Sequence, residues 1–145
     1  MASAEIEETI PVSKKRLLEV ICAYEEYPDF VEGVKSISVE RVSDSEAHVT
    51  YEVNIMKKVQ YTLKTKEDLE NGKISWTLAG ESDFFTKNSG FWEIEPQGEN
   101  TCFVRYGVDV EFKVPVPGFI LKKLVKGNLP KVVENFKNRA LSRYQ

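Results

Sequence analysis

From Phe119 to Ala140 the chain reads FILKKLVKGNLPKVVENFKNRA, and the spacing of its apolar residues predicts an amphipathic helix. Lysine, arginine and glutamate fill most positions on the other side of this helix, which we expect to face water. No other segment of the sequence is as long and as helical, so its apolar side needs a large partner surface. The apolar residues recur at intervals of three and four, and they are Leu121, Leu124, Val125, Leu129, Val132, Val133, Phe136 and Ala140.

The course of this helix at Pro130 has two interpretations. A proline inside a helix removes a backbone hydrogen bond, and its ring clashes with the preceding turn. The segment is therefore either one long helix kinked at Pro130, or a short helix capped by Gly127 and followed by a second one. In the second arrangement Pro130 lies in the first helical turn, where proline is tolerated.

The sequence between Ile37 and Phe112 changes to a period of two, which is typical of β-strands with one buried face. Residues 49–55, for example, place four apolar side chains on one face and three polar side chains on the other. Asn71-Gly72 is the strongest hairpin signal in the chain. The predicted strands cover residues 6–10, 37–41, 49–55, 59–63, 74–78, 84–95 and 102–112.

Two short helices are expected between the first strand and the rest of the sheet. Ser13 is a suitable N-cap for a helix that runs through Cys22, because its side chain can accept a hydrogen bond from the first turn. Pro28 disfavours helical backbone at Tyr27, so the chain breaks there and forms a second short helix that ends near Gly33.

This order of elements indicates an α+β fold, in which a curved antiparallel sheet of six to seven strands wraps around a long C-terminal helix. Alternation makes one face of the sheet apolar, and the terminal helix is the only element long enough to cover that face. A strongly curved sheet does not close against a helix everywhere, so we expect a cavity between them. The chain has no linker or internal repeat, and its 145 residues are expected to form a single domain over 1–145.

The composition argues against several classes of protein. Hydrophobic residues make up 41% and charged residues 30% of the chain, as in globular proteins and unlike disordered chains. No apolar run approaches the roughly 18–20 residues that a membrane span needs. Residues 1–8 are acidic and lack the apolar region of a signal peptide, so we expect a cytoplasmic protein. A net charge of −3 argues against specific nucleic-acid binding.

Cysteine and histidine are too few and too scattered to predict a metal site. Cys22 and Cys102 are separated by eighty positions, and His48, the only histidine, has no cysteine near it in the sequence. We therefore expect no metal and no cofactor, and we interpret the two cysteines as buried structural thiols.

Three stretches of the sequence carry a resemblance to known proteins: residues 11–17 with Tyr27-Pro28-Asp29-Phe30-Val31, then residues 90–101, and finally residues 129–137. They resemble the helix-grip superfamily, which includes START lipid-transfer domains, birch-pollen-allergen proteins, polyketide cyclase/dehydrase-like proteins and coenzyme Q-binding proteins. Tyr27-Pro28-x-Phe30 is similar to the motif of the cyclase-like and coenzyme Q-binding branch. That branch often carries an aspartate shortly before the Tyr-Pro pair, where this chain has Ala23-Tyr24. The resemblance covers essentially the whole chain and implies a hydrophobic ligand between sheet and helix.

Strand alternation predicts which side chains point into the cavity, and none of those it aims inward is a carboxylate, histidine or lysine. General acid–base catalysis needs a titratable group within reach of the substrate, and only tyrosines are available here. We therefore predict no catalytic residue, and a site that binds or transports a lipid, quinone or polyketide-like molecule. The predicted lining residues are Tyr51, Val53, Tyr61, Leu63, Trp76, Leu78, Trp92, Val104, Tyr106, Val108, Leu121, Val125, Leu129, Val132 and Phe136.

Two other functions remain open at this point. One is an enzyme of the polyketide cyclase/dehydrase type, for which Tyr51 and Tyr106 are the first candidates to supply a hydroxyl group. The other is a ribosome- or protein-associated interaction module that uses the lysines of the C-terminal helix, Lys122, Lys123 and Lys126.

Apolar residues near the ends of the predicted sheet also have two interpretations. Phe84-Phe85, Pro115-Val116-Pro117 and Phe119-Ile120 either form a rim at the cavity mouth, which could touch a membrane or a partner transiently, or close the core at that end. The identity of the ligand and the oligomeric state do not follow from the sequence.

Overall fold

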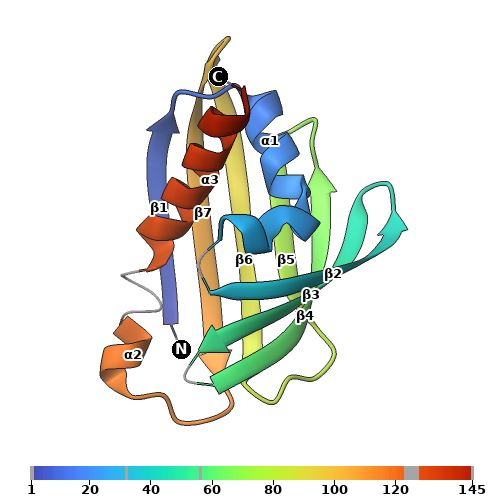
Figure 1. Ribbon diagram of the computed structural model, residues 1–145, viewed down its shortest axis with the longest axis vertical. Helices are drawn as coiled ribbons and strands as arrows, with labels where there is room; N and C mark the ends of the chain where they lie inside the picture. Colours follow the sequence, from blue (N-terminus) through green and yellow to red (C-terminus); the bar gives the residue numbers. More distant parts are fainter. Residues whose placement is uncertain (1, 32, 56, 123–127, 145) are drawn as a thin grey trace.

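The computed structural model of this chain describes residues 2–31, 33–55, 57–122 and 128–144 (Figure 1). Its elements follow the predicted order of one strand, two short helices, six strands and a C-terminal helical region. They are β1 (Ala2–Ile10), α1 (Lys14–Cys22), the 3-10 helix η1 (Tyr24–Asp29), β2 (Val34–Ser43), β3 (Glu46–Ile55), β4 (Lys57–Asp68), β5 (Lys73–Ala79), β6 (Phe85–Gly98), β7 (Thr101–Phe112), α2 (Gly118–Lys122) and α3 (Asn128–Tyr144).

The seven strands form one antiparallel sheet with the order β1-β7-β6-β5-β4-β3-β2. Strands β2 to β7 follow one another as a meander, and β1 pairs with β7, where Ile6 lies opposite Tyr106. In Figure 1, β2, β3 and β4 run across the direction of β1, β7 and β6, so the sheet curves strongly towards α3. This arrangement confirms the predicted α+β helix-grip fold.

The first short helix begins after Ser13 as predicted, but the predicted break at Tyr27 and the helix end near Gly33 are wrong, because η1 runs through Tyr27 and ends at Asp29. Ser13 caps α1, because its Oγ accepts a hydrogen bond from the backbone N–H of Arg16 at 3.3 Å. Pro28 lies inside η1, whose 3-10 geometry differs from that of α1. The hydroxyl of Tyr27 donates a hydrogen bond to the backbone carbonyl of Ile21, which fastens η1 to the end of α1.

The apolar face of α3 packs against the sheet, and Val133, Phe136 and Ala140 are almost completely buried. Pro130 is the third residue of α3 and lies in its first turn, as in the second predicted arrangement. The predicted cap, Gly127, lies outside the described residues, as do Leu124, Lys123 and Lys126.

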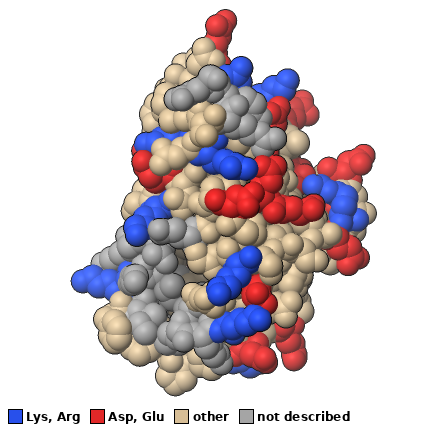
Figure 2. Space-filling view, viewed as in Figure 1, with Lys and Arg blue, Asp and Glu red and all other residues tan. Residues whose placement is uncertain are grey.

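Ion pairs connect α3 to its neighbours at the surface. Figure 2 shows acidic and basic side chains interspersed over the face that carries α3 and η1. A nitrogen of the Arg139 guanidinium lies 2.7 Å from a carboxylate oxygen of Glu26 in η1. Lys137 of α3 lies 3.6 Å from Glu8 in β1. These contacts join the helix to both η1 and the edge strand beside β7.

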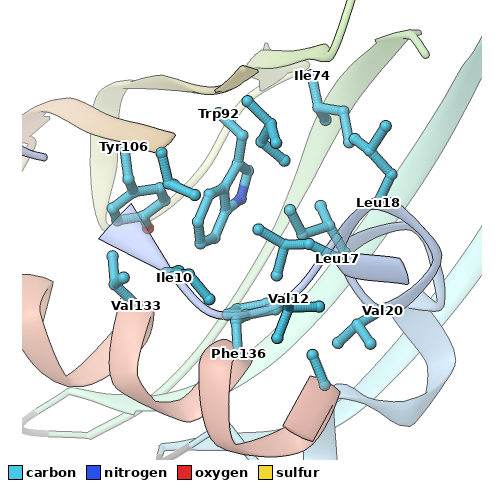
Figure 3. Packing of buried hydrophobic residues seen from close by; sticks show 14 of the residues in the cluster. Ile10, Val12, Leu17, Leu18, Val20, Ile74, Trp92, Tyr106, Val133 and Phe136 are labelled. Atoms are coloured by element: carbon cyan, nitrogen blue, oxygen red, sulfur yellow. The ribbon is translucent and has the colours of Figure 1, made fainter. Parts of the chain in front are cut away.

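The buried residues form two clusters, one at each end of the sheet. The larger cluster lies under α1 and α3, and in Figure 3 Trp92 of β6 and Phe136 of α3 point towards each other. The smaller cluster contains Phe84 and Phe85, both almost completely buried, so these two residues close the core at that end. Phe119 of α2 is 77% exposed. Among the described residues, no helix has the length and apolar character needed to cross a membrane.

Candidate ligand-binding site

A cavity of about 280 Å³ lies between the curved sheet, η1 and α3. Strands β3 to β7 form most of its wall, and Val132 and Phe136 of α3 cover it from the other side. Gly33 and Asn54 line the cavity and are also exposed to solvent, so it opens to the surface where β2 begins and β3 ends. The volume is close to the lower end of the range for small-molecule pockets, about 300–1,000 Å³.

Most of the residues predicted from strand and helix periodicity meet around this one cavity. Leu78 and Val104 do not line it, because Val104 is buried inside the larger cluster and Leu78 packs against the smaller one. Val125 and the side chains of Leu121 and Leu129 lie outside the described part of the chain. The predicted residues that line the cavity are Tyr51, Val53, Tyr61, Leu63, Trp76, Trp92, Tyr106, Val108, Val132 and Phe136.

Aromatic rings form a continuous layer over much of the cavity wall. The rings of Tyr51 and Tyr61 stack with their centroids 5.3 Å apart, from neighbouring positions on β3 and β4. The ring of Trp92 lies 4.4 Å from that of Tyr106 and 5.0 Å from that of Phe136, measured between centroids. Packed rings of this kind hold one another in place and present a large apolar surface to a ligand.

Three of the lining tyrosines, Tyr51, Tyr61 and Tyr106, have hydroxyl groups without a hydrogen-bond partner among the residues that the structure describes. Burial raises the pKa of all three tyrosines, because a phenolate at these positions would lose its hydration. The hydroxyl groups therefore stay protonated at neutral pH. They can donate hydrogen bonds to a ligand, and they are poor general bases.

The cavity also contains a polar residue that is absent from the predicted lining. Asn88 of β6 is 8% exposed and lines the cavity. Regular alternation sets its direction, because Asn88 lies four positions before the inward Trp92 and the register of β6 against β7 does not shift between them. The Lys87 side chain points the other way, and its ammonium lies 2.6 Å from the Asp109 carboxylate. A register shift between Phe85 and Lys87 lets Phe85 face the cavity as well, and we find no signal for this β-bulge in the sequence.

A buried carboxylate, Glu67, contradicts the expectation that no inward strand position carries an acid. The predicted strand ended at residue 63, whereas β4 continues to Asp68 and its alternation turns Thr65 and Glu67 inward. The two guanidinium NH₂ groups of Arg41 donate to the two Glu67 oxygens at 3.0 and 3.2 Å. Such a bidentate pair balances the charge of the buried acid.

The hydroxyl of Tyr24 also donates a hydrogen bond to a carboxylate oxygen of Glu67. Tyr24 lines the cavity, whereas Glu67 is not among the lining residues. The thiol of Cys22 lies nearby, and burial together with the negative charge of Glu67 raises its pKa to about 12. This thiol therefore stays protonated, so it is a poor nucleophile at neutral pH.

Neither the cavity nor the rest of the described chain contains a recognisable metal site. No group of three or more histidine, cysteine, aspartate or glutamate side chains in the described ranges could hold an ion. The cavity lining does contain side-chain amide and hydroxyl groups, which come from asparagine, threonine and tyrosine residues.

Comparisons with known proteins agree with this architecture. The model of the family described as polyketide cyclase/dehydrase and lipid transport matches residues 10–137. A solved START superfamily protein from Mycobacterium smegmatis is similar with 21% identity and a TM-score of 0.82, over 97% of both chains. The ZhuI aromatase/cyclase from Streptomyces sp. R1128 has 11% identity and a TM-score of 0.84, over 99% of this chain and 96% of its own.

A protein from Thermus thermophilus is similar with 23% identity and a TM-score of 0.83, over 99% of this chain and 100% of its own. None of the curated proteins that were compared matches the sequence. At these identities the solved structures show a shared fold, and the family match confirms the resemblance seen in the sequence.

Proposed function

Because this chain belongs to the polyketide cyclase/dehydrase and lipid transport family, we propose that it binds and transports a hydrophobic small molecule in the cavity beneath α3. A lipid, a quinone and a polyketide-like compound are the classes of ligand that suit this cavity. The cytoplasmic location expected from the sequence remains a prediction.

The observation that carries this proposal is the character of the cavity wall. Its described lining combines aromatic and aliphatic side chains with a few amide and hydroxyl groups, and it includes no charged residue. Each 100 Å² of apolar ligand surface removed from water contributes about 2.5 kcal/mol, part of which offsets the lost freedom of the ligand. The aromatic layer around Tyr106 and Trp92 supplies such a surface.

The test is native mass spectrometry of the purified protein, followed by solvent extraction and identification of the released compounds. A co-purifying lipid, quinone or aromatic compound supports the proposal and names the ligand class. The measurement is repeated by adding a broad panel of such compounds and recording the shift of Tm. If no compound co-purifies and none in the panel raises Tm, the binding function is wrong.

The free tyrosine hydroxyl groups support a second candidate, an enzyme of the cyclase/dehydrase type. Tyr51 and Tyr106 are close enough for their electrostatic interaction to contribute to the raised pKa of Tyr51. In an enzyme, they would donate hydrogen bonds to carbonyl oxygens of a folded substrate and favour one course of ring closure. Tyr51→Phe and Tyr106→Phe should then abolish turnover and preserve binding. If both variants retain full activity on a cyclising substrate, these hydroxyl groups have no catalytic role.

A further inference from the structure

The amide of Asn88 is a buried polar group with no partner among the described residues. Its side chain has two N–H donors and one carbonyl acceptor. It lines a cavity whose other members are mainly hydrocarbon and aromatic groups, such as Phe85 next to it and Val110 opposite it in β7. Neither its oxygen nor its nitrogen is among the fully buried side-chain atoms that lack a partner, so both are accessible from the cavity to a ligand.

The placement of Asn88 follows from its position in β6. Asn88 and Trp92 lie on the same face of the strand, because the pairing of β6 with β7 is regular between them. Lys87 therefore points away from the cavity and pairs with Asp109. The inward position next to the β-bulge thus carries an amide in a wall that is otherwise mainly apolar.

Charge is the second property of the cavity that restricts its ligand. Its described lining contains no aspartate, glutamate, lysine, arginine or histidine. Glu67, which contacts the lining residue Tyr24, already accepts hydrogen bonds from Tyr24 and Arg41. A ligand that brought a charge into this cavity would lose hydration without meeting a counterion.

We propose that Asn88 determines the specificity of the cavity, and that the ligand is an uncharged molecule which presents a carbonyl or hydroxyl group to the Asn88 amide. This inference rests on the proposed binding function and adds to it the chemistry of one contact. It separates uncharged ligands that carry such a group, for example alcohols, phenols and ketones, from pure hydrocarbons and from ionised fatty acids.

The experiment uses four probes with one aromatic body and measures each affinity by isothermal titration calorimetry at pH 7. 2-Naphthol carries the required group, and naphthalene lacks it. 2-Naphthoate and 2-naphthylmethylammonium carry a negative and a positive charge. We expect 2-naphthol to bind most tightly and both ions to bind most weakly.

The variant is Asn88→Leu, which removes the amide and keeps a side chain of similar size. The matched control is Asn138→Leu, the same substitution at an exposed position of α3 that does not line the cavity. Asn88→Leu should weaken 2-naphthol about tenfold and leave naphthalene unchanged, because one buried hydrogen bond is lost. Asn138→Leu should change neither affinity.

A direct readout is the pair of side-chain amide signals of Asn88 in a ¹H–¹⁵N spectrum, assigned by their loss in Asn88→Leu. They should shift with 2-naphthol and stay in place with naphthalene. If Asn88→Leu weakens the binding of 2-naphthol and naphthalene equally, the role of Asn88 is overturned. The same holds if the Asn88 amide signals do not shift in the 2-naphthol complex. If either ion binds as tightly as 2-naphthol, the inference that the ligand is uncharged is wrong. Absence of binding by all four probes would contradict the proposed function itself.

Discussion

The hydroxyl of Tyr24 donates a hydrogen bond to the buried carboxylate of Glu67, and this contact joins η1 to the end of β4. The two residues are separated by 43 positions in the sequence. Tyr24 also lines the cavity, so the same contact holds part of the cavity wall against the sheet.

Tyr24→Phe should therefore lower the free energy of unfolding by about 1.5–3 kcal/mol, the range for a hydrogen bond to a charged group. The control is Tyr61→Phe, which removes a hydroxyl group that has no partner among the described residues. The control should stay within about 0.5 kcal/mol of the parent. Urea unfolding followed by fluorescence measures both. Equal losses in the two variants would show that the Tyr24 contact does not stabilise the fold.

In the described structure, Arg41 is the only cationic side chain that forms an ion pair with Glu67. Removing the Arg41 guanidinium should therefore leave the buried Glu67 carboxylate without a counterion. The Arg41 side chain is 44% exposed and that of Glu67 only 4%, so solvent weakens the pair at one end. We expect Arg41→Met to cost about 1–2 kcal/mol and the double variant Arg41→Met/Glu67→Leu to recover part of that loss. A double-mutant cycle in urea measures the coupling energy. A coupling energy of zero would show that the two side chains are energetically independent.

The buried thiol of Cys22 should make stability fall at alkaline pH. Burial raises its pKa from 9.0 to about 12, so the folded protein keeps this proton at pH values where the unfolded chain releases it. The stabilisation is complete below pH 9 and is lost as the pH rises towards 12. One such group lowers the free energy of unfolding by about 1 kcal/mol between pH 8 and pH 10.

Cys22→Ala tests this assignment by its effect on the pH dependence, whatever its effect on absolute stability. Urea unfolding at pH 8, 9 and 10 should show a flatter decline in the variant than in the parent protein. The buried tyrosines add their own decline above pH 10 in both proteins, because burial raises the pKa of Tyr27 and Tyr51 as well. Identical slopes below pH 10 would rule out a contribution from Cys22.

Two glycines with positive φ should respond differently to alanine. Gly72, in the Asn71-Gly72 turn, has φ of +66°, and an added Cβ would collide with the backbone carbonyl of Ile94. Gly33 has φ of +86°, but no atom lies within 4 Å of such a Cβ. Gly33→Ala should cost about 1–2 kcal/mol from backbone strain alone. Gly72→Ala should cost clearly more, as measured by thermal unfolding. A smaller loss at Gly72 would contradict this account of the turn.

Phe136 should be the side chain of α3 that contributes most to its packing. Its ring contacts those of Tyr27, Phe30 and Trp92, with centroids 5.2, 5.1 and 5.0 Å away. Phe136→Ala should cost about 3–5 kcal/mol, because it leaves a void in the core. The same substitution at Phe119, which is 77% exposed, should change the free energy of unfolding by less than about 0.5 kcal/mol. Comparable losses at both positions would mean that burial does not account for the effect.

The order of strands and helices followed from local patterns. A period of two over residues 49–55 and a period near 3.6 over 129–140 are properties of neighbouring residues, and they predict both the element and its buried face. The same logic predicted that Tyr51, Tyr61, Trp76 and Tyr106 share one side of the sheet, and all four line the cavity.

Only the tertiary structure decided the polar chemistry around that cavity. Phe85 lines the cavity together with Asn88 because of a register shift between β6 and β7, which depends on how two strands pair and leaves no trace in a single strand's alternation. Glu67 remains buried because Arg41 and Tyr24, from β2 and η1, reach it across the fold. Apolar burial is set by local periodicity and sums over many residues, whereas each buried polar group depends on a few distant partners whose positions exist only once the chain has folded.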